Sequence, residues 1–191
     1  MRHLQLEKQG LRGLAIAESF SQSSKKSVLA GIVMRRDFVI DGFVFGHATI
    51  AGDDATNEIL QMYDKLERPD ISYMLISGII ISMYNMIDIK KIYNTLGIPI
   101  IGVTYEDSKG IEGAIKYHFP DNFESKLAEY KKLGQREKIT LDTAHDVFVR
   151  CEGCNVNEVK RLLNELTLQG STPEPLRVAQ LLAKTLFQSR F

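Results

Sequence analysis

Two nearly continuous apolar runs, separated by a stretch with helical spacing, constrain the fold of this chain more than any other feature. The runs ISYMLISGIII (71–81) and IPIIGVTYE (98–106) suit strands that are buried on both faces of a sheet. The intervening NMIDIKKIYNTLG (85–97) has helical spacing and ends in Gly97, a common stop for a helix. Strands that are joined through a helix are expected to lie parallel in one sheet.

The residues before these runs predict three further strands that can form an antiparallel meander. They are rich in Val, Ile and Phe and cover 11–20, 27–37 and 38–50. Both Arg36-Asp37 and Asp41-Gly42 could form the second turn, and the latter is a good two-residue hairpin signal. We place the turn at Arg36-Asp37, because this leaves two strands of similar length.

Helical patterns account for most of the remaining sequence. Helices are predicted at 53–67, 109–120, 122–134, 155–169 and 172–188. Asn155 and Glu158 have the spacing of a capping box, and 147–150 is a short β-like run. The fold class expected is therefore α/β: a mixed sheet, with an antiparallel three-strand meander and then parallel strands, flanked by helices. Residues 1–191 are expected to form one domain, in which about 135–191 is a C-terminal helical extension packed on the core.

Composition excludes some classes of protein. The 191 residues are 44% hydrophobic and 25% charged, with a formal net charge of zero, so no global basic field attracts nucleic acid non-specifically. The longest apolar run is shorter than the ~18 residues of a membrane span, and the first residues lack the apolar core of a secretory signal. We expect a cytoplasmic protein without a membrane partner.

Three acidic residues occupy positions where a sheet of this kind gathers functional groups. Glu18 ends the first predicted strand, and Asp53 with Asp54 stands where the third strand meets the first helix. Converging carboxylates could bind Mg²⁺, which prefers oxygen ligands, and a bound ion could activate water against a phosphodiester. Alternatively, the aspartates cap the helix and Glu18 is a solvated strand end.

Other polar residues could support such a site. Candidates beside the next strand are Ser77, Asn85 and Asp88, although Asn85 and Asp88 could simply start a helix. Basic residues that could line a phosphate-binding groove, or simply be solvated, are Arg35, Arg36, Lys90 and Lys91.

The two cysteines, Cys151 and Cys154, form a C-x-x-C pair. A structural zinc site needs two more ligands, and the sequence offers no second pair of this kind. We interpret them as turn cysteines.

Five segments together carry a resemblance to a known family: GLAIAESF, LAGIVMRRDFVIDGFVFGHATIAGDDAT, SGIIISMYNMID, IPIIGVTYE and LTLQGSTPEPLRVAQLLA. They resemble a mostly archaeal family of unknown function that is similar to endonuclease V, and so to the ribonuclease H-like superfamily. The resemblance covers nearly the whole chain. It implies a three-stranded meander followed by alternating helices and parallel strands.

Endonuclease V nicks nucleic acid near a deaminated base, using a few carboxylates and Mg²⁺. The resemblance implies that Glu18 is the first acid and that Asp53 or Asp54 is the second. The third acid is expected within MLISG, where relatives often have Leu-Asp-Gly but this chain has Ser77. Ala17 also replaces a possible ligand.

Two functions follow from this resemblance. The first is a metal-dependent endonuclease that uses Mg²⁺ or Mn²⁺ and nicks DNA at deaminated bases, with Glu18, Asp53 and Asp54 as catalytic metal ligands. Ser77, Asn85 and Asp88 would then be supporting or replacement groups. The alternative is a non-catalytic module that binds nucleic acid or a partner on the same fold, with the active site degraded at Ser77.

Overall fold

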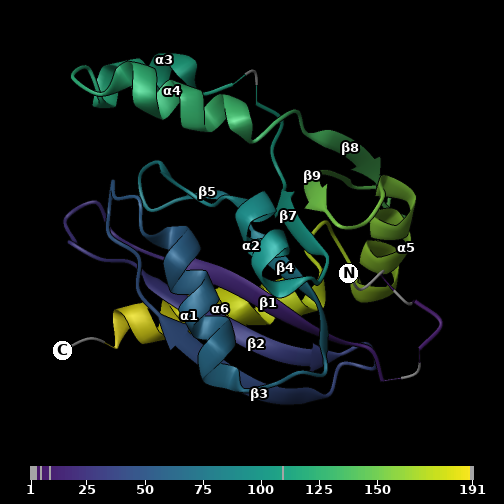
Figure 1. Ribbon diagram of the computed structural model, residues 1–191. Helices are drawn as coiled ribbons and strands as arrows, with labels where there is room; N and C mark the ends of the chain where they lie inside the picture. Colours follow the sequence, from purple (N-terminus) through teal and green to yellow (C-terminus); the bar gives the residue numbers. More distant parts are fainter. Residues whose placement is uncertain (1–3, 5, 9, 109, 190–191) are drawn as a thin grey trace.

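The computed structural model describes residues 4, 6–8, 10–108 and 110–189, and a mixed sheet lies at its centre (Figure 1). In spatial order the sheet contains β3 (Ile40–Gly46), β2 (Val28–Arg35), β1 (Arg12–Ser19), β4 (Ile71–Ser77), β7 (Ile100–Thr104), β9 (Asp146–Glu152) and β8 (Glu137–Thr140). A separate small hairpin consists of β5 (Ile80–Ile81) and β6 (Asn85–Met86). The helices are α1 (Ala55–Leu66), α2 (Ile89–Leu96), α3 (Glu112–His118), α4 (Phe123–Lys132), α5 (Val156–Leu166) and α6 (Glu174–Gln188).

The first three strands form the predicted antiparallel meander. β1 pairs with β2, and β2 pairs with β3, both in antiparallel register. The turn between β2 and β3 falls at Arg36 and Asp37, whereas Asp41 and Gly42 lie inside β3. The prediction for this turn is confirmed.

The parallel part of the sheet is also confirmed. β4 lies beside β1 and β7 lies beside β4, both in parallel register. α1 connects β3 to β4, and α2 lies between β4 and β7 in the chain. The side chains of β4 and β7 are mostly buried, as their nearly continuous apolar sequence predicts.

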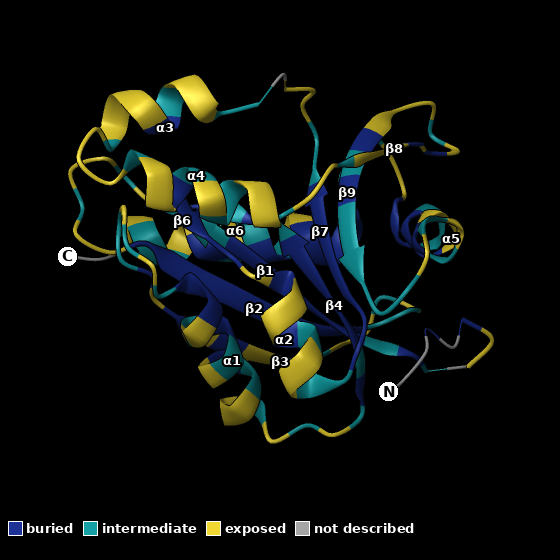
Figure 2. Cartoon of the chain, turned by 45° about the horizontal axis from the view of Figure 1, so that its top comes forward, coloured by how far each residue is buried: buried dark blue, intermediate teal, exposed yellow. Residues whose placement is uncertain are grey.

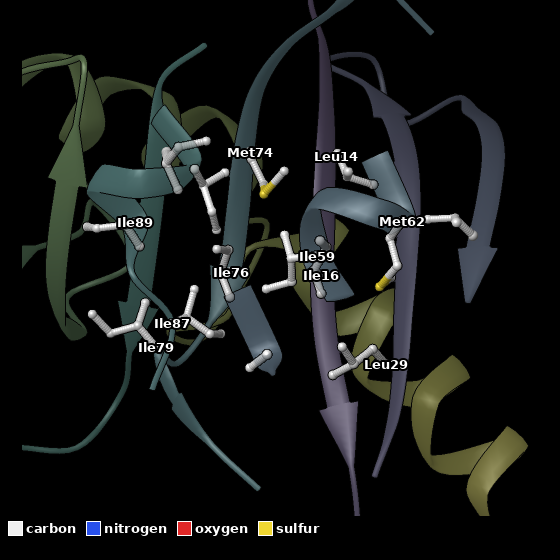
Figure 3. Close-up of a cluster of buried hydrophobic side chains, with 14 of the residues drawn as sticks. Leu14, Ile16, Leu29, Ile59, Met62, Met74, Ile76, Ile79, Ile87 and Ile89 are labelled. Atoms are coloured by element: carbon white, nitrogen blue, oxygen red, sulfur yellow. The ribbon is translucent and has the colours of Figure 1, made fainter. Parts of the chain in front are cut away.

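Helices cover both faces of the sheet (Figure 1). On one face, α1 and α2 cover a core that includes Leu14, Ile16, Ile59, Met62 and Ile76 (Figure 3). On the other face, α6 packs against β1, β2 and β4, and α5 covers the side of β8 and β9. None of the helices in the described part of the chain is long and apolar enough to cross a membrane.

The expectation of a mainly helical extension from about residue 135 is wrong for its first part. β8 and β9 form an antiparallel hairpin there, and β9 adds to the sheet in antiparallel register beside β7. Ile139, Val147 and Val149 point into the core at alternating strand positions. The β-like run at 147–150 indicated only the middle of β9. The sequence contained no signal for β8, because β8 is a short strand with one buried side chain.

Two predicted boundaries beside the central strand also shift. The strand predicted at 71–81 ends at Ser77, because Gly78 adopts a left-handed conformation with φ of 76°. The helix predicted at 85–97 begins only at Ile89, since Asn85 pairs with Ile81 in the small β5–β6 hairpin. This hairpin brings polar groups to the end of the sheet.

The α3–α4 hairpin stands apart from the sheet, at the top of Figure 1. Most of its surface is exposed (Figure 2), and Tyr117 is 81% exposed. Its attachment to the β5–β6 turn includes the ring of Tyr84, whose centroid lies 5.4 Å from that of His118 and 5.7 Å from that of Phe119. Lys126 of α4 is buried at a second attachment, beside the start of α1.

Candidate functional site

The candidate site lies where the parallel strands β1, β4 and β7 end. Glu18 and Ser77 are at the ends of β1 and β4. Because Ile16 pairs with Ile76, Glu18 lies level with Gly78, just past the end of β4. The carboxyl ends of parallel strands are where α/β folds place functional groups.

Glu18 is held by the β5–β6 turn. Ser82 donates hydrogen bonds to both carboxylate oxygens, from N to Oε1 at 2.8 Å and from Oγ to Oε2 at 2.7 Å. The hydroxyl of Ser27 lies 2.8 Å from the same Ser82 Oγ. Burial raises the pKa of Glu18 above its ordinary value, although the hydrogen bonds from Ser82 and Ser27 oppose this rise. A raised pKa suits a carboxyl that transfers a proton.

This pKa shift predicts a dependence of stability on pH. The folded state binds the Glu18 proton more tightly than the unfolded state does, so the contribution of Glu18 to stability is present at low pH. It is lost as the pH rises from the ordinary glutamate pKa of about 4.3 through the raised value. We expect Glu18→Gln to remove this loss, so that its free energy of unfolding falls less over that range. Urea titrations of both proteins across the acid range measure the difference, and equal pH slopes would contradict it.

Asp54 forms a second carboxylate centre, which is bound by β6 of the same hairpin. It accepts hydrogen bonds from Thr49 N at 2.9 Å, from Thr49 Oγ1 at 2.6 Å and from Asn85 Nδ2 at 2.7 Å. Asp54 occupies the N-cap position of α1, yet its side chain makes no capping hydrogen bond. Partial burial opposes ionisation, but the hydrogen bonds from Thr49 and Asn85 hold the pKa of Asp54 below its ordinary value.

Asn85 connects the hairpin to α1. Its side chain is fully buried, accepts a hydrogen bond from Ala55 N at 3.1 Å and donates to Thr49 O at 2.9 Å. The amide of Asn85 therefore supplies the cap that Asp54 does not. Sequence reasoning placed Asn85 near the site, as a supporting group or as the start of a helix, but did not predict this link to α1.

Asp53 is directed to the α3–α4 hairpin. Its carboxylate forms an ion pair with Lys126, whose ammonium also donates to Gly52 O at 3.3 Å and lies 5.6 Å from the centroid of the Phe119 ring. The Asp53 side chain is 70% exposed, whereas that of Lys126 is 7% exposed. The sequence prediction missed Lys126, and a lysine in a charged helix gives no signal for this contact.

The turn that joins β5 to β6 has an unusual backbone. Ser82, Met83 and Tyr84 have φ values of 46°, 58° and 70°, a left-handed run of three residues without glycine. Such conformations cost of order 1–3 kcal/mol each and persist only where the surroundings impose them. Here Ser82 O accepts a hydrogen bond from Ala51 N at 2.7 Å, which ties the turn to the loop before α1. The turn holds Glu18 through Ser82, and the next strand, β6, holds Asp54 through Asn85.

Ser77 lies on the opposite face of the sheet from Glu18. Side chains alternate along a strand: Ile16 packs in the core under α1, and Ala17 packs against Ala179 of α6. Glu18 therefore returns to the α1 side. Ser77 instead accepts a hydrogen bond from Gln180 Nε2 of α6 at 2.8 Å. Ser77 and Glu18 are not brought together.

Tyr105 lies beside Ser77 on this second face. Burial raises the pKa of Tyr105 to about 12, although polar contacts with Ser77, Thr172 and Gln180 oppose the rise. The α6 face thus carries neutral polar groups at the end of β4, at the point where the resemblance implies an acid.

Asp88 and the predicted basic residues lie in two places, at the start of α2 and at the other end of the sheet. Asp88 caps α2, accepting from Lys91 N at 2.9 Å, and both residues line a cavity of about 220 Å³ that includes Asp53. Lys90 is exposed on the same first turn. Arg35 and Arg36 lie at the other end of the sheet: Arg35 pairs with Arg12, six residues before Glu18, which corresponds to roughly 20 Å along a strand.

Those two arginines have carboxylate partners at that end. Arg35 Nη2 lies 2.6 Å from Asp37 Oδ2, and Arg36 Nε lies 3.0 Å from Glu165 Oε2. They are not placed to act together with Glu18.

The predicted ligands do not converge on one point. Within the described ranges, no group of three or more His, Cys, Asp or Glu side chains is placed to hold a metal ion. Ser82 binds Glu18, Thr49 and Asn85 bind Asp54, and Lys126 binds Asp53. As placed, Glu18, Asp53 and Asp54 do not fit a shared Mg²⁺ or Mn²⁺ ion.

Cys151 and Cys154 lie where β9 leads into α5. Cys151 Sγ lies 3.4 Å from Cys154 O, and both thiols are free.

Known proteins match this chain along nearly its whole length. A sequence model of the family described as Endonuclease dU matches residues 9–187. The chain belongs to the Endonuclease dU family. One relative, the UPF0215 protein of Pyrobaculum calidifontis, is 33% identical over 171 residues, which cover 89% of this chain and 93% of the relative.

Solved structures share the fold. A protein of unknown function from Archaeoglobus fulgidus superposes with a TM-score of 0.80 at 22% identity, covering 94% of this chain and 99% of that one. Endonuclease V of Ciona intestinalis, in complex with DNA containing an inosine followed by a ribo-adenosine, superposes with a TM-score of 0.65 at 13% identity, covering 98% of this chain and 91% of that one. The predicted ribonuclease H-like fold and the resemblance of this archaeal family to endonuclease V are confirmed.

Proposed function

We propose that this chain is an endonuclease V-like nuclease that nicks DNA at deaminated bases, and that DNA containing deoxyuridine is its main substrate. The observation that carries the proposal is that one hairpin, β5–β6, holds two carboxylates at the carboxyl ends of the parallel strands: Glu18 through Ser82 of its strained turn, and Asp54 through Asn85 of β6. The description of the family supports deoxyuridine, and the endonuclease V complex with inosine-containing DNA supports a nucleic-acid substrate.

The environments of the two carboxylates support different chemical roles. Burial favours the protonated form of Glu18, whereas hydrogen bonds favour the ionised form of Asp54. Two carboxyl groups with opposite shifts are a common arrangement for acid and base functions. Glu18 is therefore assigned to hold and move a proton at its carboxyl oxygens, and Asp54 to remain charged and orient the turn. No step is assigned to a metal ion.

The assay that tests this proposal uses end-labelled DNA with one deoxyuridine, one deoxyinosine or neither, in the presence of Mg²⁺ or Mn²⁺. We expect the wild-type chain to nick the deoxyuridine strand, and Glu18→Gln to slow this by about a hundredfold, the usual loss when a general acid or base is removed. Asp54→Asn is expected to slow it as well. Asp64→Asn is the matched control, because Asp64 is exposed on the same helix, away from the turn.

A second candidate function is binding without cleavage. It is favoured by the α6 face of the site, where Ala17 and Ser77 stand in place of the acids that the resemblance implies and Gln180 covers Ser77. A folded wild-type chain that nicks neither substrate with either metal, but binds deoxyuridine DNA more tightly than undamaged DNA, would favour this function over the nuclease.

A further inference from the structure

A basic pocket lies beside the candidate site, between α4 and the β8–β9 hairpin. Its volume is about 430 Å³, within the range of pockets that bind small ligands. Side chains that line it include Tyr130, Lys131, Arg136, Phe148 and Arg150. Arg136 and Arg150 were not among the basic residues singled out from the sequence, and neither contributes to the proposed nuclease site.

Arg136 is held in a fixed orientation in this pocket. Its guanidinium carbon lies 4.8 Å from the centroid of the Phe148 ring. Nη1 donates to Glu106 O at 2.9 Å, and Nη2 donates to Ser108 O at 2.8 Å. A guanidinium that is stacked and hydrogen-bonded in this way loses little further freedom on binding an anion.

Arg150 lies close enough to Arg136 for the two positive charges to oppose each other. Burial lowers the pKa of Arg150, and the charge of Arg136 adds to this effect, while a hydrogen bond with Tyr130 opposes it. Arg150 Nε donates to Gly134 O at 3.0 Å. In the described part of the chain, no carboxylate lies within ion-pair distance of Arg150.

Acidic groups compensate these charges only in part. Asp107 lies 3.5 Å from Arg136 but is 85% exposed, so its interaction is screened by solvent. Glu112 also lines the pocket and supplies one negative charge, against the three positive charges of Lys131, Arg136 and Arg150.

A bound anion would relieve the remaining repulsion. Arg136 would contribute mainly its charge, because its Nη atoms donate to Glu106 O and Ser108 O. Arg150, in contrast, binds Gly134 O through Nε and can present its Nη atoms to the oxygens of a phosphate.

Two neighbouring cavities share lining residues with this pocket and reach the end of the sheet. Arg136 and Arg150 also line a cavity of about 120 Å³ that reaches Gly78, immediately after β4. Arg136 lines a third cavity, of about 360 Å³, that includes Ser77. Three strand spacings, about 14 Å, separate β1 with Glu18 from β9 with Arg150. A DNA strand that is bound at Glu18 could therefore extend into the basic pocket.

We infer that the pocket of Tyr130, Lys131, Arg136, Phe148 and Arg150 binds the phosphate of a nucleotide within a DNA strand that also passes Glu18. The position of this strand rests on the proposed nuclease function, whereas recognition of the phosphate rests on the pocket alone.

The test measures the fluorescence anisotropy of a labelled single-stranded oligothymidine, without a deaminated base and in EDTA, as the whole chain is titrated. We expect Arg150→Gln to weaken binding about tenfold, the usual loss of one hydrogen-bonded charge contact. The slope of log K against log salt should fall by about 0.7, since one phosphate contact on a single strand is lost. Arg150→Lys keeps the charge and should retain most of the salt slope.

Arg161→Gln is the matched control, because it removes one arginine charge from the exposed surface of α5. An Arg150→Gln protein that melts like the wild type but binds with the affinity and salt slope of Arg161→Gln would overturn the proposal. Competition with deoxyuridine monophosphate and with inorganic phosphate distinguishes the sources of the phosphate. Displacement of the strand by these competitors at millimolar concentration supports the pocket. If binding of the free nucleotide depends on Arg150 but Arg150→Gln leaves the affinity for the oligothymidine unchanged, the proposal that the phosphate belongs to a DNA strand would be overturned.

This binding experiment involves no cleavage. If the chain does not nick DNA but its binding depends on Arg150, the proposed nuclease function is contradicted and the phosphate pocket is supported. If the chain nicks DNA but its binding does not depend on Arg150, the nuclease function is supported and the phosphate pocket is contradicted.

Discussion

Replacing Asn85 by Ala is expected to lower the free energy of unfolding by about 3 kcal/mol, because several buried hydrogen bonds are lost together. The side chain of Asn85 accepts from Ala55 N and donates to Thr49 O and Asp54 Oδ1. Its removal leaves the first amide of α1 without this cap and Asp54 without one donor. Urea unfolding followed by circular dichroism measures the change.

Asn85→Asp separates the hydrogen bond that the side chain accepts from the hydrogen bonds that it donates. Its carboxylate can still accept from Ala55 N, but it places a second negative charge beside Asp54 and cannot donate to Thr49 O. We expect a loss of stability at neutral pH that shrinks as the pH falls and one of the two carboxylates becomes protonated. A loss below about 1 kcal/mol for Asn85→Ala, the value of one ordinary hydrogen bond, would show that the link contributes little.

Replacing Ile59 by Ala is expected to cost about 3 kcal/mol, within the range for truncation of a buried isoleucine. Ile59 is fully buried on α1 and points toward Ile16 of β1 (Figure 3). The cavity would form under the helix that carries Asp54 at its start, so weaker binding of deoxyuridine DNA should accompany the loss. Thermal or urea unfolding measures the stability change.

Ile59→Val provides the graded control, since removing one methylene usually costs about 0.5–1.5 kcal/mol. Equal effects of the two substitutions would contradict the account of a packed contact between α1 and the sheet. Asn57→Ala, on the exposed side of the same helix, should change stability by less than either.

Hydrophobic period was enough to predict most of the fold. The continuous apolar runs of β4 and β7 indicated strands buried on both faces, and helical spacing indicated α1, α2, α5 and α6. The capping box of Asn155 and Glu158 is present at the start of α5. The hydrophobic pattern did not predict β8 or the β5–β6 hairpin, because strands of two to four residues contain too few positions to show alternation.

The candidate site could be predicted less completely. The positions of Glu18 and Asp54 at the ends of neighbouring elements followed from the order of strands and helices. The partners of these residues did not: Ser82 reaches Glu18 across 64 positions, and Lys126 reaches Asp53 across 73. Such contacts depend on the direction of side chains in the folded chain, which local sequence does not encode.

By itself, the sequence determined the class of the fold, its element order and the acidic character of the sheet end, because burial of apolar surface imposes a period on each element. Only the tertiary structure decided which acids share a site. Alternation along β1 and β4 sends Glu18 and Ser77 to opposite faces. The β5–β6 hairpin binds Glu18 through Ser82 and Asp54 through Asn85, while Lys126 binds Asp53. The physical reason is that a strand reverses the direction of its side chains at every residue, so one position decides on which face a carboxylate lies.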